Sequence, residues 1–73
     1  MKKKLLIEGM SWGSCVKRVR VALESIEGIK VEDIKIGEAS IVVPESISEE
    51  VINDAVYDAV YDAGYDVTEI SEI

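Results

Sequence analysis

The fold is decided by residues 3 to 29, KKLLIEGMSWGSCVKRVRVALESIEGI, where a strand, a short loop and a helix follow one another directly. Residues 3 to 8 alternate around Leu5 and Ile7, which is typical of a β-strand with one buried face. Two glycines then mark a loop before the next element. The chain therefore begins with a strand that leads straight into an unusual loop.

A helix with one buried stripe is predicted from Cys15 to about Ser25, because apolar residues recur there at spacings of three and four. The stripe consists of Val16, Val19, Leu23 and Ile26. Ser14 is well placed to cap the start of this helix, and Gly28 to end it.

A β-hairpin is predicted next, with its turn at Gly37 and Glu38. Its two strands are marked by Ile29, Val31, Ile34 and Ile36, and by Ala39, Ile41 and Val43. Pro44 should end the second strand, because proline cannot donate a hydrogen bond to a central sheet ladder.

A second helix should start near Ser48, with Glu49 and Glu50 at the positive end of its dipole. Residues 54 to 65, DAVYDAVYDAGY, repeat with period four, which fits one helix rather than a repeat array. We expect Gly64 to end it. Its core face would consist of Ile52, Ala55, Val56, Ala59, Val60 and Ala63, and its solvent face of Asp54, Asp58 and Asp62.

Tyr65, Val67 and Ile70 mark a last strand, so the element order is β-α-β-β-α-β. This order predicts a ferredoxin-like α+β sandwich, with two helices on one face of a four-stranded antiparallel sheet. Seventy-three residues allow one such domain, spanning 1–73.

The charge of the chain is strongly asymmetric. All eight Lys and Arg lie within residues 1 to 35, whereas residues 36 to 73 contain ten acidic residues and no basic one, and the net charge is -7. Because the basic residues are few and close to acids, they form no phosphate-tracking stripe, which argues against a nucleic-acid partner.

The sequence also predicts a cytoplasmic protein. No apolar run exceeds three residues, so we expect neither a signal peptide nor membrane insertion. A single Cys cannot form an internal disulfide, which agrees with a reducing compartment.

The loop and the elements around it resemble the heavy-metal-associated domains of copper chaperones and of the N-terminal modules of heavy-metal P-type ATPases. That family has a Gly-Met-Thr/Ser-Cys-x-x-Cys loop between its first strand and first helix. Here Gly9, Met10, Ser11 and Cys15 match, and Trp12 replaces the first Cys. Further matches are residues 16 to 19, Leu23, residues 27 to 29 and the ending at residues 63 to 67. The resemblance implies soft-metal transport, with copper as a cargo and a heavy-metal transporter as a partner.

Cys15 is the candidate metal ligand. At the first turn of a helix, unpaired backbone N–H groups and the helix dipole favour thiolate, and Lys17 and Arg18 add positive charge. A thiolate is a suitable ligand for Cu(I) or Zn(II). The alternative is that Cys15 is a small, half-buried residue without a role.

Three hypotheses remain for a loop with Trp12 in the first ligand position. Cys15 could bind metal with a second donor from a second copy or a partner. Alternatively, metal binding has been lost, and the exposed Trp12 docks another protein. A mixed site using the Met10 sulfur is disfavoured, because the resemblance places that side chain in the core.

The other residues of the loop region also have competing interpretations. Trp12 could fold over the end of the core instead of docking a partner. The resemblance singles out Tyr65 as the aromatic beside the loop, while Tyr57 and Tyr61 read as helix-surface neighbours. Lys17, Arg18 and Arg20 could dock an acidic partner, be simply solvated, or pair with the Asp row of the second helix.

An enzyme is not expected. The chain has no His, no Cys-His or Ser-His pair and no glycine-rich phosphate loop. A redox role for Cys15 would lack a resolving Cys.

Overall fold

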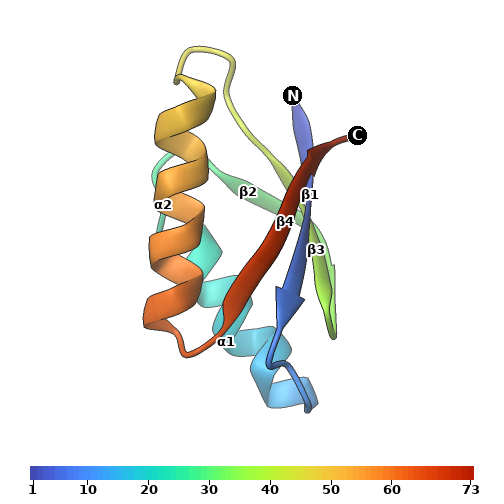
Figure 1. The fold of residues 1–73 in the computed structure, drawn as a ribbon. Helices are drawn as coiled ribbons and strands as arrows, with labels where there is room; N and C mark the ends of the chain where they lie inside the picture. Colours follow the sequence, from blue (N-terminus) through green and yellow to red (C-terminus); the bar gives the residue numbers. More distant parts are fainter.

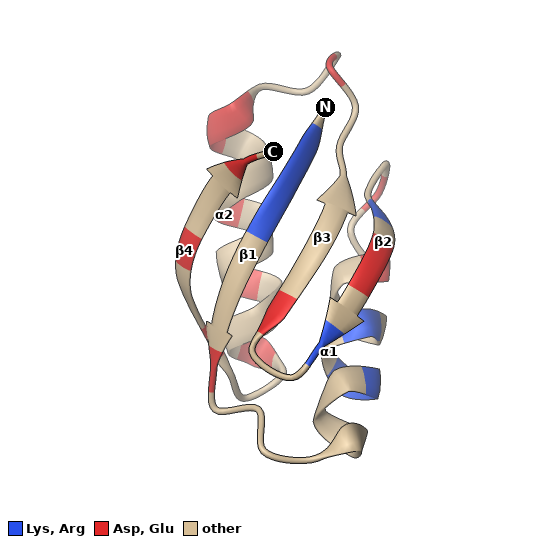
Figure 2. Ribbon diagram, turned by 90° about the vertical axis from the view of Figure 1, so that its right-hand side faces the viewer, with Lys and Arg blue, Asp and Glu red and all other residues tan.

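A computed structural model describes all residues 1–73 and shows the predicted element order. The elements are β1 (Lys2–Glu8), α1 (Gly13–Glu24), β2 (Lys30–Lys35), β3 (Glu38–Val42), α2 (Glu49–Asp62) and β4 (Asp66–Glu72). The strands form one antiparallel sheet in the order β2-β3-β1-β4. Both helices cover one face of it (Figure 1), and the other face is open (Figure 2). This confirms the ferredoxin-like fold.

The core lies between the sheet and the two helices. The inward side chains of the two central strands are buried, as are most of the large side chains on the predicted helix faces. These residues are Leu5, Ile7, Ala39, Ile41, Val19, Leu23, Ile52, Val56 and Val60. The smaller side chains of the predicted α2 face, Ala55, Ala59 and Ala63, are half-buried, as are Val16 and Ile26. The helical periodicity therefore identified the correct faces.

Two β-bulges explain why apolar residues in the edge strands do not alternate strictly. In β2 the register shifts between Val31 and Asp33, and in β4 one extra residue, Thr68, lies between the partners of Ile7 and Leu6. Because a bulge adds one residue, side chains three apart return to the same face. This is how Val31 and Ile34, and likewise Val67 and Ile70, all pack against the core.

The two helix starts differ, and one prediction about them is wrong. Ser48 caps α2, because its Oγ accepts a hydrogen bond from the Val51 N–H at 3.3 Å. Ser14, in contrast, does not cap α1: the helix begins at Gly13 with Trp12 in the N-cap position and no side-chain cap. The Cys15 N–H already donates to the Trp12 carbonyl at 2.9 Å, so the first turn closes before Ser14 could cap it.

One charged side chain enters the core side of β1. Lys3 lies on the same face as Leu5 and Ile7 and is only 2% exposed. Its Nζ donates to Glu49 Oε1 at 2.7 Å and to Asn53 Oδ1 at 3.3 Å, both on α2. The ammonium is thus satisfied within the chain.

Neither helix combines the length and the apolar character that crossing a membrane requires.

Candidate functional site

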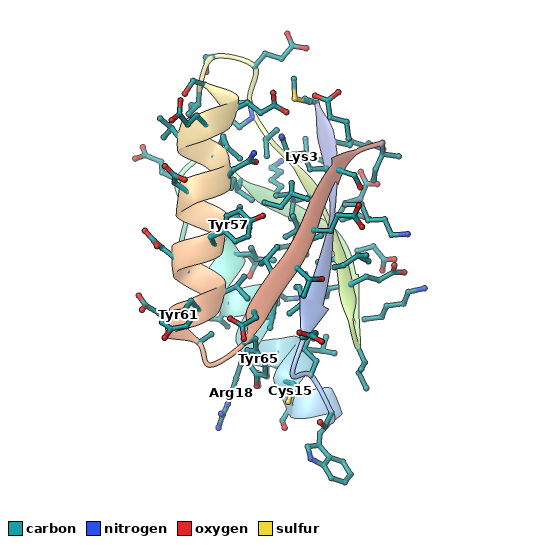
Figure 3. The ribbon with its side chains drawn as sticks, in the orientation of Figure 1. Lys3, Cys15, Arg18, Tyr57, Tyr61 and Tyr65 are labelled. Carbon is teal, nitrogen blue, oxygen red and sulfur yellow. The ribbon has the colours of Figure 1, made fainter.

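Cys15 lies at the end of the molecule where β1 passes into α1. It is the third residue of α1 and is half-buried. Gly9 turns the loop with φ +95°, and a Cβ placed there would lie 3.4 Å from Tyr65 Cδ1, so the loop packs closely on that ring. Cys15, Tyr65 and Arg18 gather at this end of the fold (Figure 3).

The surroundings of Cys15 favour its thiolate form. The pKa of Cys15 is lowered, first by a hydrogen bond with the Tyr65 side chain, and then by the backbone amides of Ser11 and Trp12. Arg18 lowers the pKa further but contributes least, and partial desolvation opposes the effect. The hydrogen bond to Cys15 raises the pKa of Tyr65, because the tyrosine must keep its proton to donate it.

The effect of the Tyr65 side chain on the pKa of Cys15 is the part of the site that sequence reasoning missed. We expected the helix start together with Lys17 and Arg18 to favour the thiolate, and of these two side chains only Arg18 acts on the thiol. Tyr65 lies fifty positions away in sequence and is the third residue after the end of α2. Its only sequence signal was the Ala-Gly-Tyr ending shared with the family.

The three tyrosines have different positions. Tyr65 is 7% exposed and packs in the core, whereas Tyr57 and Tyr61 lie on α2 and are 43% and 71% exposed. Figure 3 shows these two on the helix, away from Cys15. Period four carries the repeat along the surface of α2, and Gly64, with φ +100°, breaks it and turns Tyr65 inward.

The two other large side chains of the loop lie on opposite sides of it. Met10 is 7% exposed and belongs to the core cluster, as expected. Trp12 is 73% exposed, so the expectation that it could fold over the core is wrong. Trp12 has extended backbone angles just outside the helix, and most of its side chain is in solvent.

A single copy of this chain offers one strong soft-metal ligand. No group of three or more His, Cys, Asp or Glu side chains is close enough together to bind a metal ion. Met10 is buried, which leaves Cys15 as the accessible sulfur of the loop. One thiolate suits Cu(I) or Zn(II), but either ion needs further ligands.

The basic residues of α1 do not pair with the Asp row of α2. Arg20 forms an ion pair with Glu24 at 3.7 Å, on its own helix. Lys17 and Arg18 are exposed and make none of the five ion pairs of the chain. Their charges are therefore available at the surface.

No protein-family model and no curated protein sequence matches this chain. Solved structures do match it. "CopZ metallochaperone" is 31% identical, covers 93% of this chain and 100% of its own, and superposes with a TM-score of 0.76. The chain belongs to the heavy-metal-associated domain family.

Other solved structures share the fold of this chain. A copper binding domain from HMA7, a P-type ATPase, is 26% identical to this heavy-metal-associated domain. It covers 99% of this chain and 96% of its own, with a TM-score of 0.74. Oxidized MerP from Ralstonia metallidurans CH34 is 23% identical, covers 94% of this chain and 97% of its own, and shares the fold with a TM-score of 0.75. This heavy-metal-associated domain therefore has the scaffold of metallochaperones and metal-binding domains.

Proposed function

We propose that this heavy-metal-associated domain binds a soft metal ion, Cu(I) or Zn(II), as cargo through the Cys15 thiolate. The observation that carries the proposal is the thiol itself: it is half-buried at a helix start, and its pKa is lowered by Tyr65 and two loop amides. A thiolate that is stabilised and still accessible is the form that a soft metal binds.

The second ligand comes from another chain in this proposal. Trp12 stands where the family pattern has its first Cys, and Met10 is buried in the core. The donor would be the Cys15 of a second copy or a Cys of a heavy-metal transporter. The domain then acts in the cytoplasm as a metal-transfer protein, without catalysing a reaction.

A metal titration tests this proposal. Cu(I) or Zn(II) is added to the reduced wild type, to Cys15→Ala and to Ser14→Ala, while native mass and the fluorescence of Trp12 are followed. Ser14→Ala is a matched control, because Ser14 is the exposed neighbour of Cys15 and caps nothing. We expect one ion per two copies in the wild type and the control. Binding that is unchanged in Cys15→Ala would contradict the proposal, and no binding by the wild type would contradict a second copy as the source of the second ligand.

The alternative function is a metal-free interaction module, which the exposure of Trp12 favours. An indole that is 73% exposed is the kind of side chain that anchors protein interfaces. In-cell crosslinking with a chelator present separates the two functions. An interaction module predicts that Trp12→Ala loses its crosslinked partner and that Cys15→Ala keeps it; metal-dependent docking predicts the loss of the partner in Cys15→Ala.

A further inference from the structure

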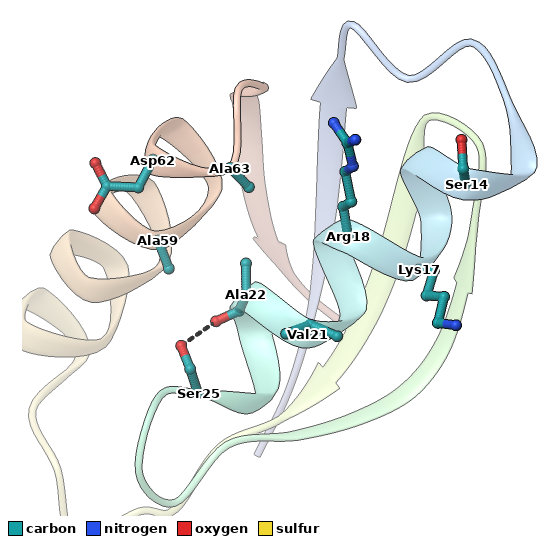
Figure 4. Close-up of a pocket in the computed structure, with 9 residues that line it drawn as sticks. All are labelled: Ser14, Lys17, Arg18, Val21, Ala22, Ser25, Ala59, Asp62 and Ala63. Atoms are coloured by element: carbon teal, nitrogen blue, oxygen red, sulfur yellow. Dashed lines mark hydrogen bonds between the residues drawn. The ribbon is translucent and has the colours of Figure 1, made fainter.

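The outer side of the helix layer carries a groove between α1 and α2. Its volume is about 620 Å³. Lys17 and Arg18 line it from α1, Asp62 lines it from α2, and small residues such as Ala22 and Ala59 lie between them (Figure 4). The groove therefore has basic side chains on the α1 side and an acidic side chain on the α2 side.

The charges at this groove are ones that the chain itself leaves unpaired. Five of the eight basic side chains form ion pairs within the chain. The three that do not are Lys17, Arg18 and Lys30, so two of the three lie at the groove. On α2, the exposed Asp54, Asp58 and Asp62 form no ion pair either.

Exposed apolar side chains accompany these charges on both helices. Val21 on α1 is 61% exposed and lines the groove, and Tyr61 on α2 is 71% exposed. A surface that combines exposed apolar side chains with unpaired charges of both signs can dock a partner by burial and by charge at once. The partner must present acidic side chains to Lys17 and Arg18, and basic side chains to Asp62.

The chain itself presents this arrangement of charges. α1 begins and α2 ends at the same end of the molecule (Figure 1), so the basic part of α1 and Asp62 lie level with each other. A two-fold axis parallel to the helices would place α1 of one copy over α2 of the other. Lys17 and Arg18 would then meet Asp58 and Asp62 of the second copy, twice per pair.

We infer that the helix layer is a self-complementary docking surface for a second copy of this chain. The net charge of -7 opposes association, but the repulsion between distant charges is screened beyond about 8 Å at physiological salt, whereas contacting pairs are not. The pair is therefore weak and forms without metal. Both Cys15 loops lie at the same end of it, although the inference does not depend on metal binding.

The experiment measures self-association without metal. Sedimentation equilibrium is run with a chelator on the full chain and on Cys15→Ser, at up to about 1 mM protein and about 0.15 M salt. We expect both proteins to form dimers. Since Cys15→Ser cannot bridge copies through a thiolate, failure of metal binding and failure of this dimer are distinguishable. Wild type that stays monomeric throughout this range would overturn the inference.

Charge reversals locate the surface. Lys17→Glu should weaken the dimer by about tenfold, because each copy exchanges an attraction for a repulsion. Lys30→Glu is the matched control: it makes the same charge change at an exposed, unpaired lysine on β2, away from the groove. Equal weakening by both variants would mean that only the net charge matters, and would overturn the inference.

An acidic-to-basic substitution on α2 separates docking from general charge repulsion more clearly. Asp58→Lys reduces the net negative charge, so repulsion between whole molecules predicts a tighter dimer, whereas docking of α1 on α2 predicts a weaker one. Glu69→Lys on β4 is its control, because it makes the same charge change on an exposed acid outside α2. An equimolar mixture of Lys17→Glu and Asp58→Lys should recover a heterodimer, since both of its contacts are attractive. No recovery in the mixture would overturn the proposed arrangement.

Discussion

The two ends of the helix layer place polar groups against the core in different ways. At one end, the Lys3 ammonium is 2% exposed and satisfied by Glu49 and Asn53 of the same chain. At the other end, the Tyr65 side chain and two loop amides lower the pKa of Cys15, which remains half-exposed. Figure 3 shows the two groups at opposite ends of the fold.

The difference distinguishes a structural group from a candidate functional one. A buried charge whose partners are all supplied by its own chain has nothing left to bind. A stabilised thiolate with an accessible side keeps bonding capacity for an ion or a partner. Adding a second thiol beside Cys15, or replacing the buried Lys3, tests this comparison.

The largest effect is expected from adding a second thiol ligand beside Cys15. Trp12→Cys places a second thiol in the loop, three residues before Cys15, at the position that our proposal assigns to a lost metal ligand. A structural zinc site yields about 10 to 16 kcal/mol from four ligands, so one added ligand of about 3 kcal/mol should tighten metal binding by about 100-fold. Competition titration with a chromophoric chelator measures this gain. Affinity equal to that of Trp12→Ser would show that the loop geometry has diverged as well.

Replacing Lys3 should destabilise the fold mainly through the loss of buried side-chain volume, and less through the loss of its charge. Lys3→Ala removes a buried side chain and should lower the free energy of unfolding by about 2 kcal/mol. Lys3→Met keeps the apolar stem and should cost less than about 1 kcal/mol, because the Glu49 side chain that loses its partner is 55% exposed. Urea denaturation of both variants measures the difference, and equal losses would show that the charge dominates.

Removing the Tyr65 hydroxyl should raise the pKa of Cys15, because this hydrogen bond is the largest cause of its lowering. In Tyr65→Phe the alkylation rate of the metal-free thiol should therefore rise at higher pH than in the wild type. Tyr61→Phe is the control, since Tyr61 is 71% exposed. A pH profile that does not move in Tyr65→Phe would show that the loop amides alone stabilise the thiolate.

The smallest effect concerns acid stability at the Lys3 end. Lys3 lowers the pKa of Glu49 in the folded chain, so the pair stabilises the fold above the ordinary glutamate pKa of about 4.3. That contribution is lost as the pH falls through the folded-state pKa. Glu49→Gln should thus be less stable than the wild type near neutral pH, and the gap should close in acid. Glu50→Gln, an exposed neighbour without an ion pair, should show a smaller gap.

Much of the fold follows from local patterns in the sequence. Helical spacing identified Val19, Leu23, Val56 and Val60 as core residues, because one face of a helix must be buried on the sheet. The bulges in β2 and β4 were not predictable, since a spacing of three in a strand becomes interpretable only when its pairing partner is known. Ser14 was a good cap by residue type, yet the loop starts α1 one residue before it.

The sequence by itself determined the order of elements, the buried faces and Cys15 as the only thiol, because periodicity and residue identity are local properties. Only the tertiary structure decided what surrounds that thiol. Tyr65 lowers the pKa of this thiol because α2 returns the chain to the end of the molecule where β1 passes into α1, and the same loop leaves Trp12 73% exposed. The hydrogen-bond partners of Lys3 likewise come from α2. Whether a polar group is fully satisfied within the chain or stays accessible therefore depends on contacts between residues far apart in the sequence.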